Sequence, residues 1–427
     1  MAAHGERAPR VPPRQPVPLI PTQTPTRGAA LGQTADVIAS LEESPDLDVP
    51  REDQLDERPH EGAARRFGRL SARPALIYAI SRAGILLVAG AVASNAHEHF
   101  TKALIVWDSP WYLSIARSGY VSAIPPGTGN AAQSNLGFFP LLPLLIRATH
   151  DVTGFGYSVS GLVITFVIGL LSAIAVWWLL WEVFGESGAT KGTALVFFSP
   201  GALVLSLVYT EGLTILLVSC VLIALRRRQW LLAGVCAALA TAADPVSVAV
   251  IVPCGIASYL AIRARGEWRS LLAPLLAPLG VGAFFTYLWA HTGSPFEWFN
   301  AQRAGWQTGS FGGSVPTAVA AVWRHGFSNP DAVVKVISLI VALVLLVVFL
   351  RAHQAAPWVG YVITVLAIGI LSPIIGITPR LLLRNFPLLG VVGARLDSMW
   401  FEIVLGFSTL CMAALAVLAM GGGRWTP

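Results

Sequence analysis

Asp108 is the residue whose type and position best suit chemistry, in the segment VWDSPWYLSIARSGY (106–120). Its carboxylate lies beside long apolar stretches, where an ionised group is costly and usually has a partner or a function. It could act as a general base or position an acceptor hydroxyl at the water–lipid boundary. It could also cap a helix whose first turn contains Pro110, and the two roles are compatible.

Aromatic side chains surround this acid on both sides. Trp107, Trp111 and Tyr112 are typical of the aromatic belt that membrane proteins place at the lipid interface. Flat aromatic rings can equally stack on sugar rings. We therefore keep these three residues as candidate substrate contacts beside the belt interpretation.

A second acid, Glu211, stands in SPGALVLSLVYTEG (199–212), where one apolar stretch ends and the next begins. It is either an ordinary loop acid or a second catalytic carboxylate facing the Asp108 segment. Tyr209 and Thr210 supply hydroxyl groups next to it, and Tyr209 is a further candidate substrate contact.

Two arginines, Arg380 and Arg384, are four residues apart in ITPRLLLRNFPLLG (377–390). On a helix this spacing puts both on one face. Guanidinium groups suit the phosphate or pyrophosphate of a lipid substrate. Long basic side chains also reach ordinary lipid headgroups, so this alternative stays open.

Two weaker candidates complete the set. SPFEWFNAQRAGW (294–306) is typical of an amphipathic loop helix, in which Gln302 and Arg303 could bind substrate or face the membrane surface. Asp244 lies in TAADPVS (241–247), and an Asp-Pro pair favours a turn.

Composition defines the elements that must position these side chains. The 427 residues are 55% hydrophobic and only 12% charged, which excludes an ordinary soluble domain. Repeated long apolar stretches predict an all-α polytopic membrane protein with about eleven spans. The expected spans are 74–94, 157–183, 190–208, 209–225, 230–243, 246–262, 271–290, 332–350, 358–371, 380–394 and 399–420.

Residues 1–70 differ from this pattern, because they are rich in Pro, Arg, Glu and Ala and have no sustained apolar period. We expect a disordered tail there, before a transmembrane domain over 71–422. Arginines at 65, 66, 69 and 73 predict that the tail is cytoplasmic. The segment 137–150 is too short to span and is expected to lie at the interface.

With the N-terminus inside, alternation of the spans places the basic loops 226–228 and 263–269 in the cytoplasm. The same alternation places Asp108, Glu211, Asp244 and Arg380 together on the outer side. The formal net charge of +6 is therefore interpreted as a topology signal. The sequence has no basic patch with interleaved aromatics, so it does not indicate a nucleic-acid partner.

Several common site types are missing from the sequence. We find no P-loop, GxSxG, HExxH or Rossmann fingerprint, so a cytoplasmic nucleotide-sugar site has no support. The eight histidines form no evident metal set, and a divalent cation is possible but unsupported. The four cysteines lie in apolar segments without metal-like spacing, so we expect buried thiols and no disulfide framework.

Taken in order, WDSPWYLSIARSGY, NLGFFPLLPLLIR, YTEG, AQRAGW and PRLLLRNFPLL resemble the PIG-V-like mannosyltransferases over about 73–420. These are GT-C glycosyltransferases, so the resemblance implies a GT-C-type bundle with interfacial helices in an extracytoplasmic first loop. It implies a polyprenyl-phosphate-mannose donor, an inverting transfer and a first-loop aspartate near the acceptor, which Asp108 matches. Arg380 and Arg384 match the family's terminal Pro-Arg region and are the candidate phosphate ligands.

One position departs from the family pattern: a basic residue is expected where Asp244 stands. The Arg-, Ala- and Gly-rich composition is typical of actinobacterial proteins. It suggests a multi-pass protein of the cell membrane, a decaprenyl-phosphate-mannose donor and an envelope glycolipid or glycoprotein acceptor. Two other classes stay open: a flippase for a lipid-linked sugar, although we see no paired broken helices, and a scaffold without catalysis.

Overall fold

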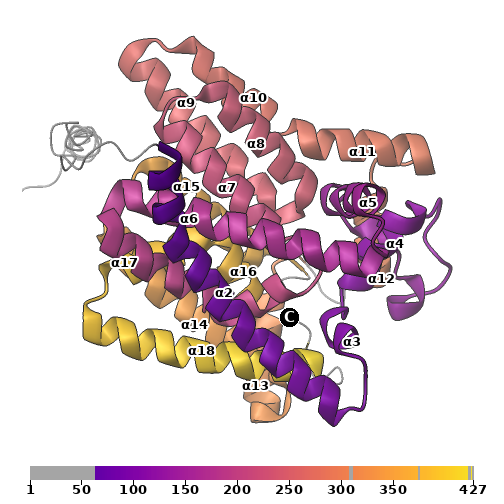
Figure 1. Ribbon diagram of the computed structural model, residues 1–427. Helices are drawn as coiled ribbons and strands as arrows, with labels where there is room; N and C mark the ends of the chain where they lie inside the picture. The colour runs from indigo at the N-terminus through magenta and orange to yellow at the C-terminus, as the bar shows by residue number, and fades with distance from the viewer. Residues whose placement is uncertain (1–62, 307–310, 374–375, 422–424, 426–427) are drawn as a thin grey trace, which may run out of the picture. The chain divides into compact units, whose positions relative to one another are not determined.

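The computed structural model describes residues 63–306, 311–373, 376–421 and 425 (Figure 1). The predicted tail therefore falls almost wholly outside the described residues and stays a prediction. Helix α2 begins at Ala63, earlier than the boundary at residue 71 that the composition suggested.

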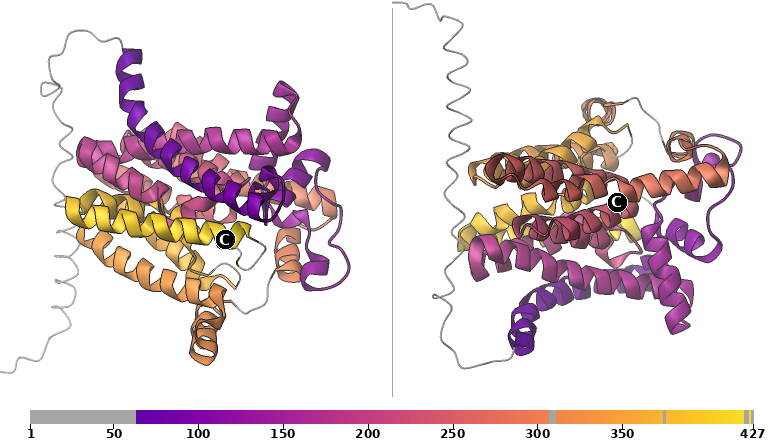
Figure 2. Two further views of the ribbon diagram at one scale, coloured as in Figure 1. Left: turned by 60° about the horizontal axis from the view of Figure 1, so that its bottom comes forward. Right: turned by 90° about the horizontal axis from the view of Figure 1, so that it is seen from above.

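The described residues form helices joined by turns and loops. The α-helices are α2 (Ala63–Asn95), α3 (Phe100–Leu104), α4 (Ser109–Ser118), α5 (Leu141–Thr153), α6 (Tyr157–Phe197), α7 (Glu211–Arg226), α8 (Trp230–Ala243), α9 (Ile251–Arg265), α10 (Leu272–Leu276), α11 (Leu279–Thr292), α12 (Glu297–Gly305), α13 (Ser314–His325), α14 (Pro330–Arg351), α15 (Ala356–Leu371), α16 (Pro379–Arg384), α17 (Phe386–Arg395) and α18 (Ser398–Met420). The short 3-10 helices are η2 (Gly129–Ala132), η3 (Asn135–Gly137), η4 (Pro200–Ser206), η5 (Pro245–Val250), η6 (Trp268–Leu271) and η7 (Gly326–Ser328). Figure 2 shows from two further directions that α13 projects from the bundle beside α14.

Six helices in the described part are long and apolar enough to cross a membrane, or up to seven if the bent pair η4–α7 is one span. This confirms an all-helical, multi-pass membrane protein. The predicted count of about eleven is not shown, because several expected spans are too short. Helices α8, α15 and α17 have only 14, 16 and 10 residues, and a straight crossing needs about 20.

Helix α6 folds back on itself at Gly185. That glycine has φ 67° and ψ −172°, a non-helical conformation that other residues rarely adopt. Trp177 Nε1 on one side of it donates to Thr190 Oγ1 on the other at 3.4 Å, whereas thirteen residues of straight helix would separate them by about 20 Å. The two limbs therefore form a helical hairpin, in agreement with the two spans expected on either side of this glycine.

Two expected spans are broken where proline interrupts the backbone ladder. The span predicted over 190–208 ends in α6 at Phe197, and η4 then begins at Pro200 and bends by 107° into α7. The span predicted over 380–394 divides at Asn385, before Pro387, into α16 and α17. A proline lacks the backbone N–H that would continue the helix, so both breaks have a local cause.

Charged side chains gather at the end of the bundle where α2 begins and α7 ends. Arg73 pairs there with Glu186, and Arg227 with Glu182. Arg228 lies 3.1 Å from Glu267 in the same region. Helix α7 has 16 residues and starts at Glu211, so its two ends are about 24 Å apart. The basic loops are thus separated from the Glu211 region by the thickness of the bundle.

One arginine in the first span is buried without an acid partner among the described residues. Arg82 on α2 is 3% exposed. Its Nη1 donates to Ala202 O at 2.6 Å and Ser206 Oγ at 2.9 Å, and its Nη2 donates to Phe197 O at 3.2 Å. Carbonyl groups at helix C-termini carry partial negative charge, so these acceptors compensate the buried cation.

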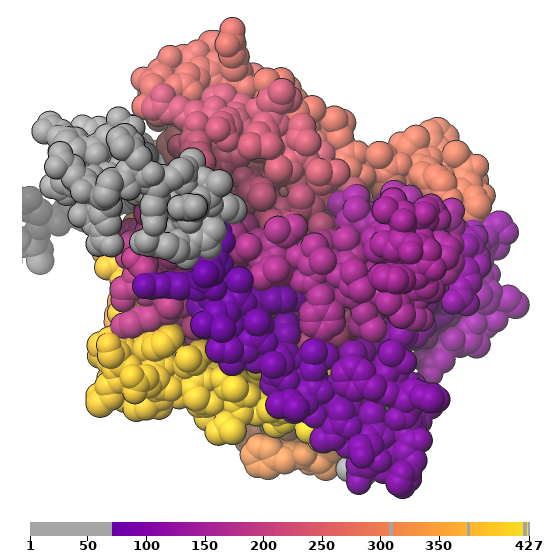
Figure 3. Space-filling view, viewed as in Figure 1, coloured from indigo at the N-terminus to yellow at the C-terminus, as the bar shows by residue number. Residues whose placement is uncertain are grey.

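This contact network ties α2 to the bend that precedes the Glu211 region. Helices α2 and α18 lie side by side on the face shown in Figure 3. Beneath this face, the buried Arg82 Nη2 is 4.0 Å from Met412 Sδ. Arg82 therefore lies where four elements meet: α2, α6, η4 and α18.

Replacing Arg82 by Met should lower the free energy of unfolding by about 2–4 kcal/mol, because Ala202 O and Ser206 Oγ lose the guanidinium donor and Phe197 O keeps only Ser81 Oγ. The measurement is the thermal or denaturant midpoint of the purified protein in detergent. Arg324→Met, at an exposed position on α13, is the matched control and should change stability by less than about 0.5 kcal/mol. Equal midpoints for the two variants would show that the Arg82 network is not a structural anchor.

Candidate active site

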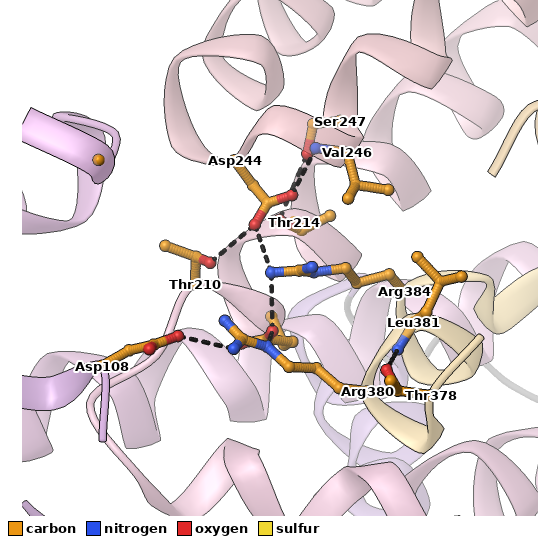
Figure 4. Close-up of polar contacts among 12 residues, drawn as sticks. Asp108, Thr210, Thr214, Asp244, Val246, Ser247, Thr378, Arg380, Leu381 and Arg384 are labelled. Carbon is orange, nitrogen blue, oxygen red and sulfur yellow. Dashed lines mark hydrogen bonds and ion pairs between the residues drawn. The ribbon is translucent and has the colours of Figure 1, made fainter. Parts of the chain in front are cut away.

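Five charged side chains from four elements converge beside the start of α7 (Figure 4). Asp108 immediately precedes α4, Glu211 is the first residue of α7, and Asp244 immediately precedes η5. Arg380 and Arg384 both lie on α16. Acids at helix N-termini are favourable because the helix dipole is positive there. Residues that are up to 276 positions apart in the chain thus form one cluster.

The two guanidiniums bridge the three carboxylates. Arg380 Nη1 donates to Asp108 Oδ2 at 2.6 Å, and Arg380 Nε donates to Glu211 Oε1. Arg384 Nη2 lies 2.9 Å from the same Glu211 Oε1 and 2.5 Å from Asp244 Oδ2. The predicted common face of the two arginines is therefore turned toward Glu211, and the chain of contacts runs Asp108, Arg380, Glu211, Arg384, Asp244.

The cluster has a more exposed outer pair and a buried inner part. The Asp108 and Arg380 side chains are 23% and 16% exposed, whereas Arg384, Asp244 and Glu211 are 6%, 2% and 0% exposed. A buried carboxylate without a partner would be very costly, so the inner part of the cluster must stay paired. The outer pair, Asp108 with Arg380, is the part that solvent can reach.

The cluster is not fully satisfied. Glu211 Oε2 and Arg384 Nε are buried and have no hydrogen-bond partner among the described residues. With all five groups ionised, the cluster carries one more negative than positive charge. Orphaned polar atoms in a buried network mark positions where water or a ligand group belongs.

Helix α16 is fixed at both ends. Thr378 Oγ1 accepts from Leu381 N at 3.2 Å and Pro379 occupies the first turn, a standard N-terminal combination. Tyr361 donates its hydroxyl to Arg384 O at 2.9 Å at the other end. Gly201 of η4 packs directly against the Pro379 carbonyl, leaving no room for a Cβ. The arginines are thereby held at a defined distance from η4 and the start of α7.

Asp108 occupies the N-cap position of α4, but its side chain makes no capping hydrogen bond. The capping interpretation of its carboxylate is therefore wrong, because the carboxylate is directed to Arg380 instead. Its backbone N–H donates to Tyr209 Oη at 3.2 Å, and Arg380 Cζ lies 4.5 Å from the centroid of the Tyr209 ring. Tyr209 thus contacts both members of the outer pair, the backbone of Asp108 through its hydroxyl and the guanidinium of Arg380 through its ring.

The aromatic residues around Asp108 mostly serve packing. Trp107 has a positive φ of 58° and donates its Nε1 to Ala419 O at 2.9 Å. Trp111 stacks on Phe138 with ring centroids 5.9 Å apart, and Tyr112 packs edge-on against the same ring. Burial, followed by the nearby Asp108 carboxylate, raises the pKa of Tyr112 far above its usual range, so this phenol stays neutral.

The structure does not bring the α12 candidates into the charged cluster. Gln302 donates its Nε2 to Gly137 O at 2.8 Å, which fixes α12 to the end of η3. Arg303 is exposed on the same helix. The aromatic ring of Trp306, which follows α12, lies 6.0 Å from that of Trp111 on α4. Gln302 therefore has a positioning contact, and substrate contacts by Gln302 and Arg303 stay predictions.

Asp244 is the residue that sequence reasoning undervalued. Its Oδ1 accepts from Val246 N at 2.8 Å, as an Asp-Pro turn predicts. Its Oδ2 also accepts from Thr210 Oγ1 at 3.2 Å and pairs with Arg384. The sequence did place Asp244 on the same side as Asp108, Glu211 and Arg380, and an acid, a turn and a helix start recur at Asp108, Glu211 and Asp244 alike.

The arginines occupy the space between the acids that a divalent cation would need. Within the described ranges, no group of three or more His, Cys, Asp and Glu side chains is arranged to hold a metal ion. Carboxylates and guanidiniums can accept a proton and bind an anion.

The helices define a multi-pass membrane protein, and its fold is similar to one solved structure. ArnT from Cupriavidus metallidurans, whose crystal structure is bound to undecaprenyl phosphate, is similar, with a TM-score of 0.50 and 16% sequence identity. The match covers 81% of this chain and 64% of ArnT, so the chain spans less than two thirds of that protein. No protein-family model and no curated protein matches the chain, so the PIG-V-like family is not shown.

Replacing Gly201 by Ala should displace α16, because the new methyl group meets the Pro379 carbonyl and the Arg380 backbone nitrogen. Overpacking of this kind costs about 1–3 kcal/mol. The thermal midpoint in detergent measures the loss. Gly255→Ala on α9, where nothing lies within 4 Å of the added Cβ, is the control and should be neutral or slightly stabilising. A Gly201→Ala variant as stable as the control would contradict the close backbone contact.

Removing Arg384 should cost more stability than removing the charge of Asp244. Arg384→Gln leaves Asp244 without its cation, at a cost of about 3–5 kcal/mol for a broken buried pair. In Asp244→Asn, Arg384 keeps Glu211, so the cost should be about half as large. Denaturant titration of both single variants and the double variant measures the order and the coupling. The more exposed pair Arg228 and Glu267 is the control, with an expected coupling below about 1 kcal/mol.

Proposed function

We propose that this chain is a membrane glycosyltransferase that moves a sugar from a polyprenyl-phosphate donor to an acceptor hydroxyl. The observation that carries the proposal is Arg380, which joins the reachable carboxylate Asp108 to the buried carboxylate Glu211. A proton acceptor and a phosphate ligand are thus held side by side. The likeness to ArnT, a protein seen with undecaprenyl phosphate, supports a lipid-phosphate donor.

The proposed reaction needs no further protein group. The acceptor oxygen attacks C1 of the sugar, and the bond between C1 and the phosphate oxygen breaks. Asp108 takes the proton of the acceptor hydroxyl, and the bonding pair leaves with the polyprenyl phosphate. Arg380 stabilises the additional negative charge on that phosphate, which is the charge that develops in the transition state. Glu211 holds the guanidinium in place.

The finer assignment is a PIG-V-like mannosyltransferase with an inverting reaction. The ordered motifs around Asp108 and Arg380 support mannose as the sugar, and the Arg-, Ala- and Gly-rich composition supports an envelope glycolipid or glycoprotein as the acceptor. We place the site on the extracytoplasmic face of the cell membrane and the N-terminus in the cytoplasm. The basic residues that follow α7 and α9 support this orientation, because they lie at the end of the bundle away from Asp108.

A flippase for a lipid-linked sugar is the second candidate. The bent pair η4–α7 favours it, because transporters often bind substrate at discontinuous helices. A flippase moves the intact lipid between leaflets and forms no new glycosidic bond. Product analysis separates it from a transferase, whose labelled sugar appears on a second molecule.

Asp108→Asn should lower sugar transfer by at least about 100-fold, because the acceptor proton loses its base. The assay mixes purified protein in nanodiscs with polyprenyl-phosphate-[14C]mannose and membranes of a deletion strain, and counts label in new glycolipid or glycoprotein. Asp151→Asn, an equal charge change at an exposed position on α5, should retain wild-type transfer.

The thermal midpoint of Asp108→Asn must match the wild type for the comparison to be valid. Unchanged transfer in a folded Asp108→Asn variant would remove Asp108 from the mechanism. Movement of the intact donor across liposome membranes, with no labelled product in any preparation, would replace the transferase by the flippase.

A further inference from the structure

The ion-pair cluster has one fixed part and one part that can open. The fixed part is Arg384 with Asp244 and Glu211, all of which are nearly inaccessible to solvent. Asp244 is held in addition by Val246 N and Thr210 Oγ1, and the backbone of Arg384 is held by Tyr361. These contacts cannot separate without moving η5 or α16.

The outer pair has fewer constraints. The Asp108 side chain makes no capping bond, and its described polar contact is with Arg380 Nη1. Arg380 is held independently through Nε by Glu211 and through its face by the Tyr209 ring. If Asp108 moves away, the guanidinium therefore stays in place and presents its Nη edge to the opening.

We propose that Asp108 covers the phosphate-binding edge of Arg380 in the resting protein and that the donor phosphate takes over this edge, releasing Asp108 to act as the base. The inference rests on the proposed function and adds an order of events to it. While Oδ2 accepts from the guanidinium, only Oδ1 of Asp108 is open to the proton of an acceptor hydroxyl, and displacement by the phosphate frees the whole carboxylate. In this order of events, donor binding precedes full activation of the acceptor.

Charge and geometry favour this exchange. Carboxylate and phosphate both accept from guanidinium N–H groups, so they compete for the same edge of Arg380. Nη1 has two N–H groups, but a phosphate on this edge would lie next to the Asp108 carboxylate, and the repulsion between the two anions disfavours binding of both at once. After transfer, the protonated Asp108 no longer pairs with Arg380, and it must lose its proton before the resting pair forms again.

The test is equilibrium binding of undecaprenyl phosphate in phosphatidylcholine nanodiscs, with undecaprenol as the control lipid that lacks the phosphate. Asp108→Asn should bind undecaprenyl phosphate about fivefold more tightly than the wild type, because the competing carboxylate is gone. Asp108→Glu keeps the competitor and should bind like the wild type, as should Asp151→Asn. Arg380→Gln should bind about tenfold more weakly.

The outcomes separate the two proposals. If the wild type binds undecaprenyl phosphate no better than undecaprenol, the lipid-phosphate transferase is wrong and the exchange falls with it. If the wild type binds and Asp108→Asn binds equally or more weakly, the exchange alone is wrong. Tightening by Asp108→Glu as large as that by Asp108→Asn would also overturn it, because the effect would then be steric. A loss of transfer with tighter donor binding in Asp108→Asn is the result that supports both.

Discussion

Glu211 Oε1 accepts from two guanidiniums at once, and the remaining contacts of the site follow from this sharing. Glu211 is completely buried at the start of α7. One carboxylate cannot neutralise two cations in a low-dielectric interior, so each arginine requires a second acid. Asp244 supplies it for Arg384, and Asp108 supplies it for Arg380. The site is therefore a chain of alternating charges whose inner part is permanent and whose outer part is reachable.

The backbone is shaped to bring these charges together. The bend between η4 and α7 places the first turn of α7 in the middle of packed helices, and Arg82 binds the carbonyls on the other side of that bend. The contact of Gly201 with Pro379 sets the distance between η4 and α16. In a continuous helix through this region, Glu211 would lie on the side of one long helix and would not stand at a helix N-terminus. The irregular backbone is stable because side chains and neighbouring helices satisfy the polar groups that it leaves free.

Much of this fold follows from the amino-acid sequence, because apolar length and proline position act locally. The hairpin of α6 was indicated by the interruption between two apolar runs, and the four-residue spacing of Arg380 and Arg384 predicts a common face. The ion pairs could not be predicted, since they depend on how α4, α7, η5 and α16 pack. Asp244 was assigned to a turn because that explanation was locally sufficient. Arg82 carried a signal that was overlooked: a single charge inside an apolar run requires a buried partner.

The arrangement also explains why the guanidiniums are covered rather than open. An uncovered arginine at a membrane surface binds the phosphate of any neighbouring lipid headgroup. Asp108 removes that possibility, because an entering phosphate must displace a carboxylate that is already paired at 2.6 Å. A lipid that also places a sugar and a polyprenyl chain in complementary positions gains enough additional binding to achieve this, whereas a headgroup phosphate alone does not. Under the proposed exchange, the pair of Asp108 with Arg380 would therefore also discriminate between lipids that share the phosphate group.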